Sequence, residues 1–219
     1  MSALGHEARP FLSEPTGAVA LPALIVLAGP PGAGKGTQCI ELAQQHGMAH
    51  VSIGALLRQE IAGGTALGSR VRAALDAGRL APDGDVSEIV SERLAQHRTA
   101  SAVLLDGFPR TIQQAELLEE LRPNAVGLVV LLVLPMAAVL QRLRGRGRAD
   151  DGDREVVAER MLTYDRDTKP VLAWYADRGL VAHVDAHASP RDVTTRITAH
   201  LAAFGLCTPP PPSGEPQLD

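Results

Sequence analysis

The stretch AGPPGAGKGTQC, residues 28–39, decides the fold class of this chain, because it gathers four glycines and two prolines around a single lysine. Glycine loses more backbone entropy on folding than any other residue, so a segment that only fills a core does not favour this composition. The Pro-Pro pair at 30–31 also prevents regular strand pairing, just where an apolar run over 23–29 ends. The stretch therefore predicts a loop that holds a ligand.

The segments on either side of this loop indicate which kind of ligand it holds. An apolar strand precedes it and a helical pattern over 35–46 follows it, so backbone N–H groups meet at a helix N-terminus, where anions bind. The Gly-x4-Gly-Lys spacing at 29–35 fits the phosphate-loop pattern, except that Gly36 precedes the hydroxyl residue Thr37. The loop predicts a nucleoside triphosphate and leaves the acceptor open among water, a sugar or nucleoside, and a nucleotide.

The bulk composition limits the class of protein. A chain of 219 residues with 45% apolar and 21% charged side chains suits one globular domain of ordinary size. The net charge of −4 gives no general attraction to nucleic acid or to an anionic membrane, so neither is an expected partner. Cys39 and Cys207 form no CxxC pair, which argues against a zinc site and a disulfide scaffold. The longest apolar run, 125–140, is short for a membrane span, and we expect a cytoplasmic protein.

Apolar runs alternate along the chain with helical patterns. Predicted strands are the runs 23–29, 101–107, 125–134 and 180–186, with a weaker candidate at 48–54. Predicted helices follow at 35–46, 111–121, 136–144 and 189–204, and Thr111 with Gln114 resembles a capping box. Runs that are apolar throughout are typical of strands covered on both faces. The sequence therefore predicts an α/β fold, a P-loop NTPase-type parallel sheet flanked by helices.

Two internal segments and the two ends lie outside this alternation. Residues 54–97 are helical with breaks at glycine and proline, which predicts an inserted helical subdomain. The segment 144–153, RGRGRADDGD, is almost all glycine and charge and cannot be core. We expect disorder at 1–22 and in the proline-rich tail 207–219.

The second anchor of the predicted site is LLDGFPR, residues 104–110, at the end of a strand. Ligands of open parallel sheets lie beyond the carboxyl ends of the strands, so Asp106 is expected to face the same crevice as Lys35. Its carboxylate can hold water molecules around Mg²⁺, and Arg110 can bind a phosphate with two parallel hydrogen bonds.

A group of arginines follows, and its usual explanation is a solvated charge run. The spacing of two along a segment interrupted by glycine favours side chains that converge on an anion instead. Transfer between two nucleotides needs positive charge on both sides and a lid that excludes water. The group comprises Arg142, Arg144, Arg146, Arg148 and Arg160.

With these residues placed, the chain resembles the adenylate kinases of the nucleoside monophosphate kinase group, in their short-lid bacterial form, from about residue 23 to 204. The motifs that carry the resemblance, in the family's order, are GPPGAGKGTQ, VSIGALLR (51–58), DAGRLAPD (76–83), LLDGFPRTIQQA (104–115) and RGRGRADD (144–151). Several motifs in order are far more specific than any one of them.

The resemblance implies a fold organisation and an activity. The domain would span 23–206, with a helical insertion for the nucleoside monophosphate at about 52–81 and a short lid at about 144–154. The activity would be the reversible Mg²⁺-dependent reaction of ATP with AMP that gives two ADP, without zinc. We expect a monomer, because nothing in the sequence indicates a large exposed apolar face.

The resemblance also implies the site residues. Those implied for ATP are Gly32, Ala33, Gly34, Lys35, Gly36, Thr37, Arg142, Arg146 and Ala188. Those implied for AMP are Ile53, Arg58, Arg79, Leu80, Ala81, Gly107, Phe108, Pro109, Arg110, Gln114, Arg148 and Arg160. The catalytic set would be Lys35, Arg110, Arg142, Arg148 and Arg160, with Asp106 on Mg²⁺ through water and with Asp150 and Asp151 holding the closed lid.

Two departures from the family pattern fall beside the acceptor. Ile53 stands where the family has Thr, and Ala55 stands where it has an acidic residue near the magnesium water shell. Gln114 favours adenine as the acceptor base, whereas Ile53 weakens that preference. A kinase for CMP, UMP or dAMP, and a nucleotide-binding regulator with weak transfer, are therefore alternatives.

Overall fold

The computed structural model of this chain describes residues 21–145 and 151–208. Predictions that concern 1–20 and 209–219 lie outside the described residues, and so do those for Arg146, Arg148 and Asp150.

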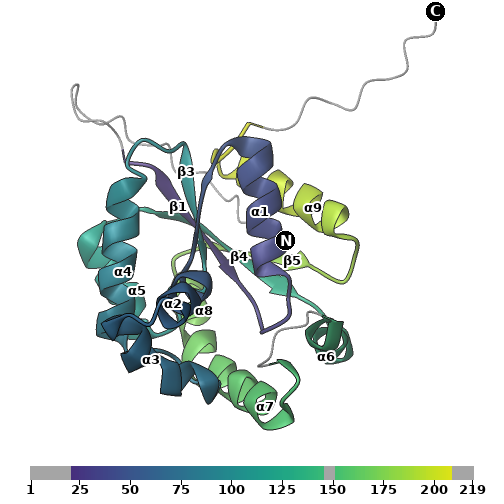
Figure 1. The fold of residues 1–219 in the computed structure, drawn as a ribbon. Helices are drawn as coiled ribbons and strands as arrows, with labels where there is room; N and C mark the ends of the chain where they lie inside the picture. The colour runs from purple at the N-terminus through teal and green to yellow at the C-terminus, as the bar shows by residue number, and fades with distance from the viewer. Residues whose placement is uncertain (1–20, 146–150, 209–219) are drawn as a thin grey trace, which may run out of the picture.

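Five parallel strands form one sheet in the order β2-β3-β1-β4-β5, which Figure 1 shows in the middle of the molecule. The strands are β1 (Ala23–Ala28), β2 (Ala49–Ser52), β3 (Ala102–Asp106), β4 (Val126–Val133) and β5 (Val181–Asp185). All five predicted strands are confirmed, including the weaker candidate, and the α/β fold class is confirmed with them. Since Leu27 of β1 pairs with Asp106, the end of β3 lies beside the start of the glycine loop.

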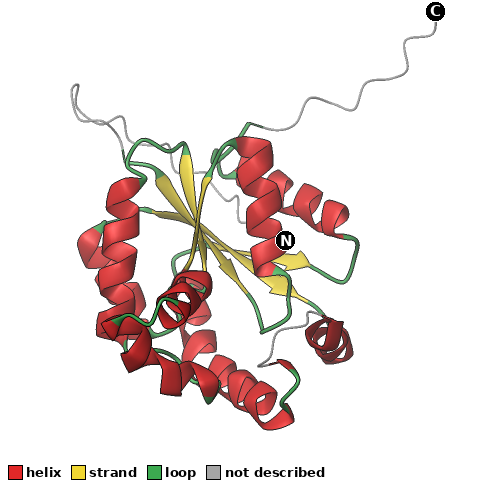
Figure 2. Cartoon of the chain, in the orientation of Figure 1, coloured by secondary structure: helices red, strands yellow, loops and turns green. Residues whose placement is uncertain are grey.

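Helices cover both sides of the sheet (Figure 2). They are α1 (Lys35–His46), α2 (Ile53–Ala62), α3 (Ala66–Asp76), α4 (Asp83–Gln96), α5 (Ile112–Leu121), α6 (Met136–Gly145), α7 (Arg154–Thr163), the π-helical segment η2 (Tyr164–Thr168), α8 (Lys169–Ala176) and α9 (Pro190–Ala203). The predicted breaks separate α2, α3 and α4. Within the described ranges, no helix is long and apolar enough to span a membrane.

Successive residues of β1 enter two different cores. Leu24 and Val26 pack in the cluster beneath α4, α5 and α8, whereas Ile25 and Leu27 pack in the cluster beneath α1 and α9. All four are at most 3% exposed, because neither face of the central strand meets water. This explains why the strand is apolar throughout instead of alternating. Figure 1 shows α1 and α9 together on one side and α4 and α5 on the other.

The packed structure extends slightly beyond the predicted domain. Pro22 belongs to the predicted N-terminal extension, but its carbonyl accepts a hydrogen bond of 2.6 Å from Arg122 Nη2. Cys207 belongs to the predicted tail, but its side chain packs against the α1 and α9 core and donates to Thr198 O at 3.7 Å. The first contact joins residues 100 positions apart and the second joins residues nine positions apart. Composition alone does not indicate such contacts.

Candidate active site

A cleft of about 1010 Å³ opens along the carboxyl edge of the sheet. Its volume is at the upper end of the range for a single small ligand, which suits two nucleotides better than one. Among the described residues, Arg144 and Asp151 do not line it, whereas the other predicted site residues do: Gly32, Ala33, Gly34, Lys35, Gly36, Thr37, Ile53, Arg58, Arg79, Leu80, Ala81, Asp106, Gly107, Phe108, Pro109, Arg110, Gln114, Arg142, Arg160 and Ala188. The structure thus brings these residues together, and the role of each stays a prediction.

The glycine loop supplies one end of the cleft. Helix α1 begins at Lys35, directly after the loop, so the unpaired N–H groups of its first turn face the cleft. The Lys35 ammonium donates to the carbonyls of Gly29 and Pro30 at 2.8 and 3.0 Å. These bonds hold the positive charge over the loop, where phosphate oxygens would lie.

Asp106 lies at the end of β3, next to this loop. Its Oδ2 accepts a hydrogen bond of 3.1 Å from Ser52 Oγ, and a Cβ atom at Gly36 would lie 3.3 Å from the same oxygen. A side chain at 36 would therefore crowd this carboxylate, which would have to shift by a few tenths of an ångström. Within the described ranges, no three His, Cys, Asp or Glu side chains form a group that could hold a metal ion. One carboxylate beside a phosphate loop fits Mg²⁺, which keeps most of its waters and binds substrate phosphates.

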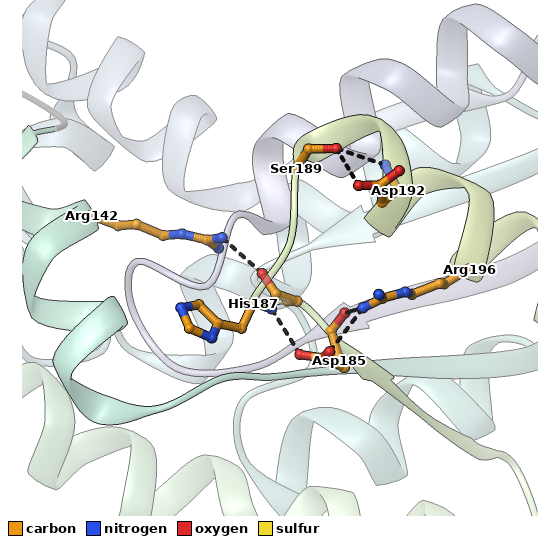
Figure 3. A network of polar contacts seen from close by, with 7 residues as sticks. Arg142, Asp185, His187, Ser189, Asp192 and Arg196 are labelled. Carbon is orange, nitrogen blue, oxygen red and sulfur yellow. Dashed lines mark hydrogen bonds and ion pairs between the residues drawn. The ribbon is translucent and has the colours of Figure 1, made fainter.

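Arg142 ties the glycine loop to the loop after β5. From α6 its guanidinium donates to Ala33 O at 3.1 Å and to Ala186 O at 2.7 Å. Figure 3 shows Arg142 reaching the segment that carries His187. Two segments that follow different strands are thereby held at a set separation. Sequence analysis predicted a phosphate contact for Arg142 and missed this bridge between two backbone carbonyls.

Asp185 stabilises the same loop from its other side. Its Oδ1 accepts from the backbone N–H of His187 at 2.9 Å, and its Oδ2 accepts from Arg196 at 2.9 Å (Figure 3). The His187 N–H and then Arg196 lower the pKa of this carboxyl group below its ordinary value, because both favour the charged form. These bonds hold the loop that carries Ala188, which lines the cleft.

The arginines on the opposite wall lie close to one another. Arg110 folds over its own loop and donates from Nε to Gly107 O at 3.0 Å. Burial lowers the pKa of Arg110, and the positive charge of Arg160 lowers it further, whereas Asp106 raises it. Two guanidinium groups of like charge that face one cleft favour the binding of an anion there.

Helix α7 carries Arg160 and contacts the segment before Arg79. Arg160 pairs with the buried Asp151 at 2.7 Å, and a Cβ atom at Gly78 would lie only 2.7 Å from the carbonyl oxygen of Val156. Gly78 also has φ +73, so both the backbone conformation and the close packing require glycine there. The segment after α3 that carries Gly78 and Arg79 is thus in direct contact with α7.

Gln114 is buried in the wall of the cleft where the acceptor is predicted to bind, with 2% of its surface exposed. Its Nε2 donates to Asp83 Oδ1 at 2.6 Å, and its Oε1 accepts from the backbone N–H of Arg110 at 2.7 Å. The capping-box prediction is half correct: Thr111 Oγ1 accepts from Gln114 N, but the Gln114 side chain bonds Arg110 instead of Thr111. Asp83 was missed, because only the fold brings α4 and α5 together.

Apolar side chains complete the acceptor wall, and sequence analysis did not assign them. Leu57, Ile61 and Val86 line the cleft from α2 and α4. Ile53 is 2% exposed, so its side chain enters the core and no more than a small part of it reaches the cleft.

The chain that forms this cleft matches a known protein family. The family model described as adenylate kinase matches residues 27–180 of the chain. A protein named adenylate kinase from Parasynechococcus marenigrum (strain WH8102) is 42% identical over 181 residues, which cover 81% of this chain and 98% of the relative. Another protein of that name, from Mycobacterium ulcerans (strain Agy99), is 42% identical over 180 residues, 81% of this chain and 98% of the relative.

Proposed function

This chain belongs to the adenylate kinase family, and on that premise we propose how its cleft transfers a phosphoryl group from ATP to AMP. An oxygen of the AMP phosphate attacks the γ-phosphorus of ATP, and the bond from that phosphorus to the β,γ-bridging oxygen breaks. Both products are ADP. No group on the protein becomes covalently modified, so catalysis consists of positioning and charge neutralisation.

The donor half of the cleft holds ATP through the loop and α6. Backbone N–H groups of 32–37 surround the phosphates, with the Lys35 ammonium at the transferred group. Arg142 lies between this loop and Ala186, where it neutralises phosphate charge. It also holds in place the loop after β5, which carries Ala188 and is called the base loop below because Ala188 would contact the base of ATP.

The acceptor half holds AMP through helices outside the sheet. Arg58 and Arg110 bind its phosphate, and Arg160 lies where acceptor and transferred phosphoryl group meet. Gln114 bonds the base above the wall formed by Leu57, Ile61 and Val86. The segment at about 52–81 is the nucleoside monophosphate insertion in this proposal, and the short lid at about 144–154 includes Arg146 and Arg148.

Mg²⁺ belongs to the proposal with Asp106 as its protein anchor, through water. When bound with ATP, the ion neutralises charge on the phosphates of the donor. The contribution of the chain is to hold the Asp106 carboxylate with Ser52 Oγ and to leave room for it at Gly36.

We place the enzyme in the cytoplasm as a monomer. The predicted site residues that line the cleft all come from one chain, so a second copy is not needed to complete them. Cys39 and Cys207 are both free thiols, as is usual in a reducing compartment.

The observation that carries the proposal is the convergence of Lys35, Arg110, Arg142 and Arg160 on one cleft. Four cations gathered in this way suit two phosphate chains facing each other better than one nucleotide and water. The family match does not favour the alternatives of another monophosphate or a regulator without transfer.

The experiment is a panel of acceptors with ATP and Mg²⁺, in which ADP formation from AMP, CMP, UMP and dAMP is compared. The expected result is the highest kcat/KM for AMP. A higher value for another monophosphate would contradict the choice of acceptor. Binding of ATP with no ADP formed from AMP at any Mg²⁺ concentration would instead indicate a regulator.

A further inference from the structure

We infer that Asp83 is a positioning residue that fixes the orientation of the Gln114 amide, so that the acceptor site selects a 6-aminopurine against a 6-oxopurine. This inference rests on the proposed function, since it concerns how the same acceptor site recognises its base.

The two residues come from different helices and meet behind the cleft wall. Asp83 begins α4 and Gln114 lies in the first turn of α5, 31 positions later. Of the described residues, Gln114 lines the cleft, whereas Asp83 and Thr111 are absent from its lining. Asp83 therefore acts on a bound base only through Gln114.

The chemistry of its partners allows the Gln114 amide one orientation. Asp83 accepts from Gln114 Nε2 on one oxygen and from Thr111 Oγ1, at 3.0 Å, on the other, so neither oxygen needs a proton. An ionised carboxylate only accepts, so the amide nitrogen must face Asp83. The backbone N–H of Arg110 only donates, so the amide oxygen must face Arg110. Exchanging the two ends of the amide would break both bonds.

The orientation determines what remains for the cleft. The amide nitrogen keeps one hydrogen and the oxygen keeps one lone pair, so the side chain offers one donor and one acceptor. Adenine presents a 6-amino donor beside the N1 acceptor, which complements that pair. A 6-oxopurine presents an acceptor beside an N1–H donor, so it would meet a buried amide with like groups facing each other.

A mismatch of this kind is costly, because Gln114 is 2% exposed and cannot rotate into water. Sites that pair a buried polar group with the correct ligand reject an analogue that leaves the group unpaired far more strongly than apolar pockets reject a change of size. Asp83 thus restricts the Gln114 amide to one of its two orientations, and that orientation selects a 6-aminopurine.

The test compares kcat/KM for AMP with that for inosine monophosphate, its 6-oxo analogue, in the full chain and in Asp83→Asn. The substitution keeps the size of the side chain. Because an asparagine amide can both donate and accept, the Gln114 amide could then adopt its two orientations more evenly. We expect the preference for AMP to fall by about tenfold, through a higher KM for AMP and with kcat at saturating AMP nearly unchanged.

Asp85→Asn is the matched control, because Asp85 lies in the same first turn of α4 but pairs with the exposed Arg70. It removes the same charge near the same helix end and should leave the preference unchanged. If Asp83→Asn does not fold, Thr111→Val provides the second variant, with Thr111→Ser as its control. Loss of the hydroxyl removes one of the two bonds to Asp83, together with the N-cap bond from Gln114 N, and should lower the preference about threefold.

The outcomes separate this inference from the proposed function. A wild-type chain that forms no ADP from AMP would overturn the proposed function. An active wild-type chain whose preference for AMP is the same in Asp83→Asn would overturn only the inference. Equal losses of kcat for both substrates would also overturn it, since they would show that Asp83 merely joins α4 to α5.

Discussion

The two halves of the cleft are built in different ways. The donor half stands on loops at the carboxyl edge of the sheet and is held by backbone atoms, as in the bonds from Arg142 to Ala33 O and Ala186 O. The acceptor half stands on helices outside the sheet and is held by side chains, as in the bond from Gln114 to Asp83. In the first case a side chain joins two backbone carbonyls, whereas in the second two side chains bond each other.

Substitutions should affect the two halves differently. Backbone N–H groups bind phosphate whatever the side chains are, provided that the loop keeps its glycines. Recognition of a base by side chains changes with each substitution. Of the two departures from the family pattern, Ile53 concerns the acceptor base and Ala55 the magnesium water shell, and both lie at the start of α2.

Replacing Lys35 with Ala should have the largest effect, because it removes the positive charge that the carbonyls of Gly29 and Pro30 hold over the glycine loop. We expect kcat to fall by about 100- to 1,000-fold while the melting temperature stays nearly unchanged. Lys169→Ala is the control, since its pair with Asp165 is more than half exposed and should contribute little. A Lys35 variant with wild-type turnover would contradict the role of the donor half.

Arg142→Ala tests whether the donor half depends on its backbone bridge. Loss of two charged hydrogen bonds to carbonyls should release the base loop and raise KM for ATP by about ten- to 100-fold, with a smaller change in KM for AMP. Arg144→Ala, on the same helix and exposed, should change neither constant. An equal rise of both KM values would show that the two halves are not independent.

Gly78→Ala tests the contact between the acceptor segment and α7. The new Cβ atom would lie 2.7 Å from Val156 O and 3.0 Å from Arg160 Cγ, so the segment must move away and KM for AMP should rise several-fold. Gly64→Ala is the matched control, because Gly64 has φ +65 and no atom within 4 Å. Each substitution should cost about 1 kcal/mol from backbone strain, but only the first should change KM. Denaturant unfolding and steady-state kinetics measure the two effects.

Asp185→Asn should have the smallest effect, confined to acid. The folded chain lowers the pKa of Asp185, so the charged form stabilises the fold above the ordinary carboxyl pKa, and this contribution is lost as the pH falls below about 4. The melting temperature of the wild type should therefore fall more steeply between pH 5 and pH 3 than that of the variant, by at most about 2 °C. Trp174 fluorescence provides the measurement, and parallel curves would contradict the assignment.

Local patterns predicted most of the fold and the donor half. The apolar run at 23–29 and the helical pattern at 35–46 appear as β1 and α1 with nearly the same bounds, because neighbouring residues carry the information. The phosphate loop is likewise a continuous motif. Asp83 could not be predicted in the same way, since the APD tripeptide indicates only the start of a helix and its partner is 31 positions away.

The sequence by itself determined the parallel sheet, the glycine loop and the collection of cations. Each of these follows from a continuous motif or from the alternation of apolar runs with helical patterns. Only the tertiary structure decided which carbonyls Arg142 joins, which way the Gln114 amide faces and how Gly78 meets α7. Those contacts join segments that approach each other only when the chain packs. Hydrogen bonds and close contacts depend on positions to within a fraction of an ångström, which no spacing along the chain specifies.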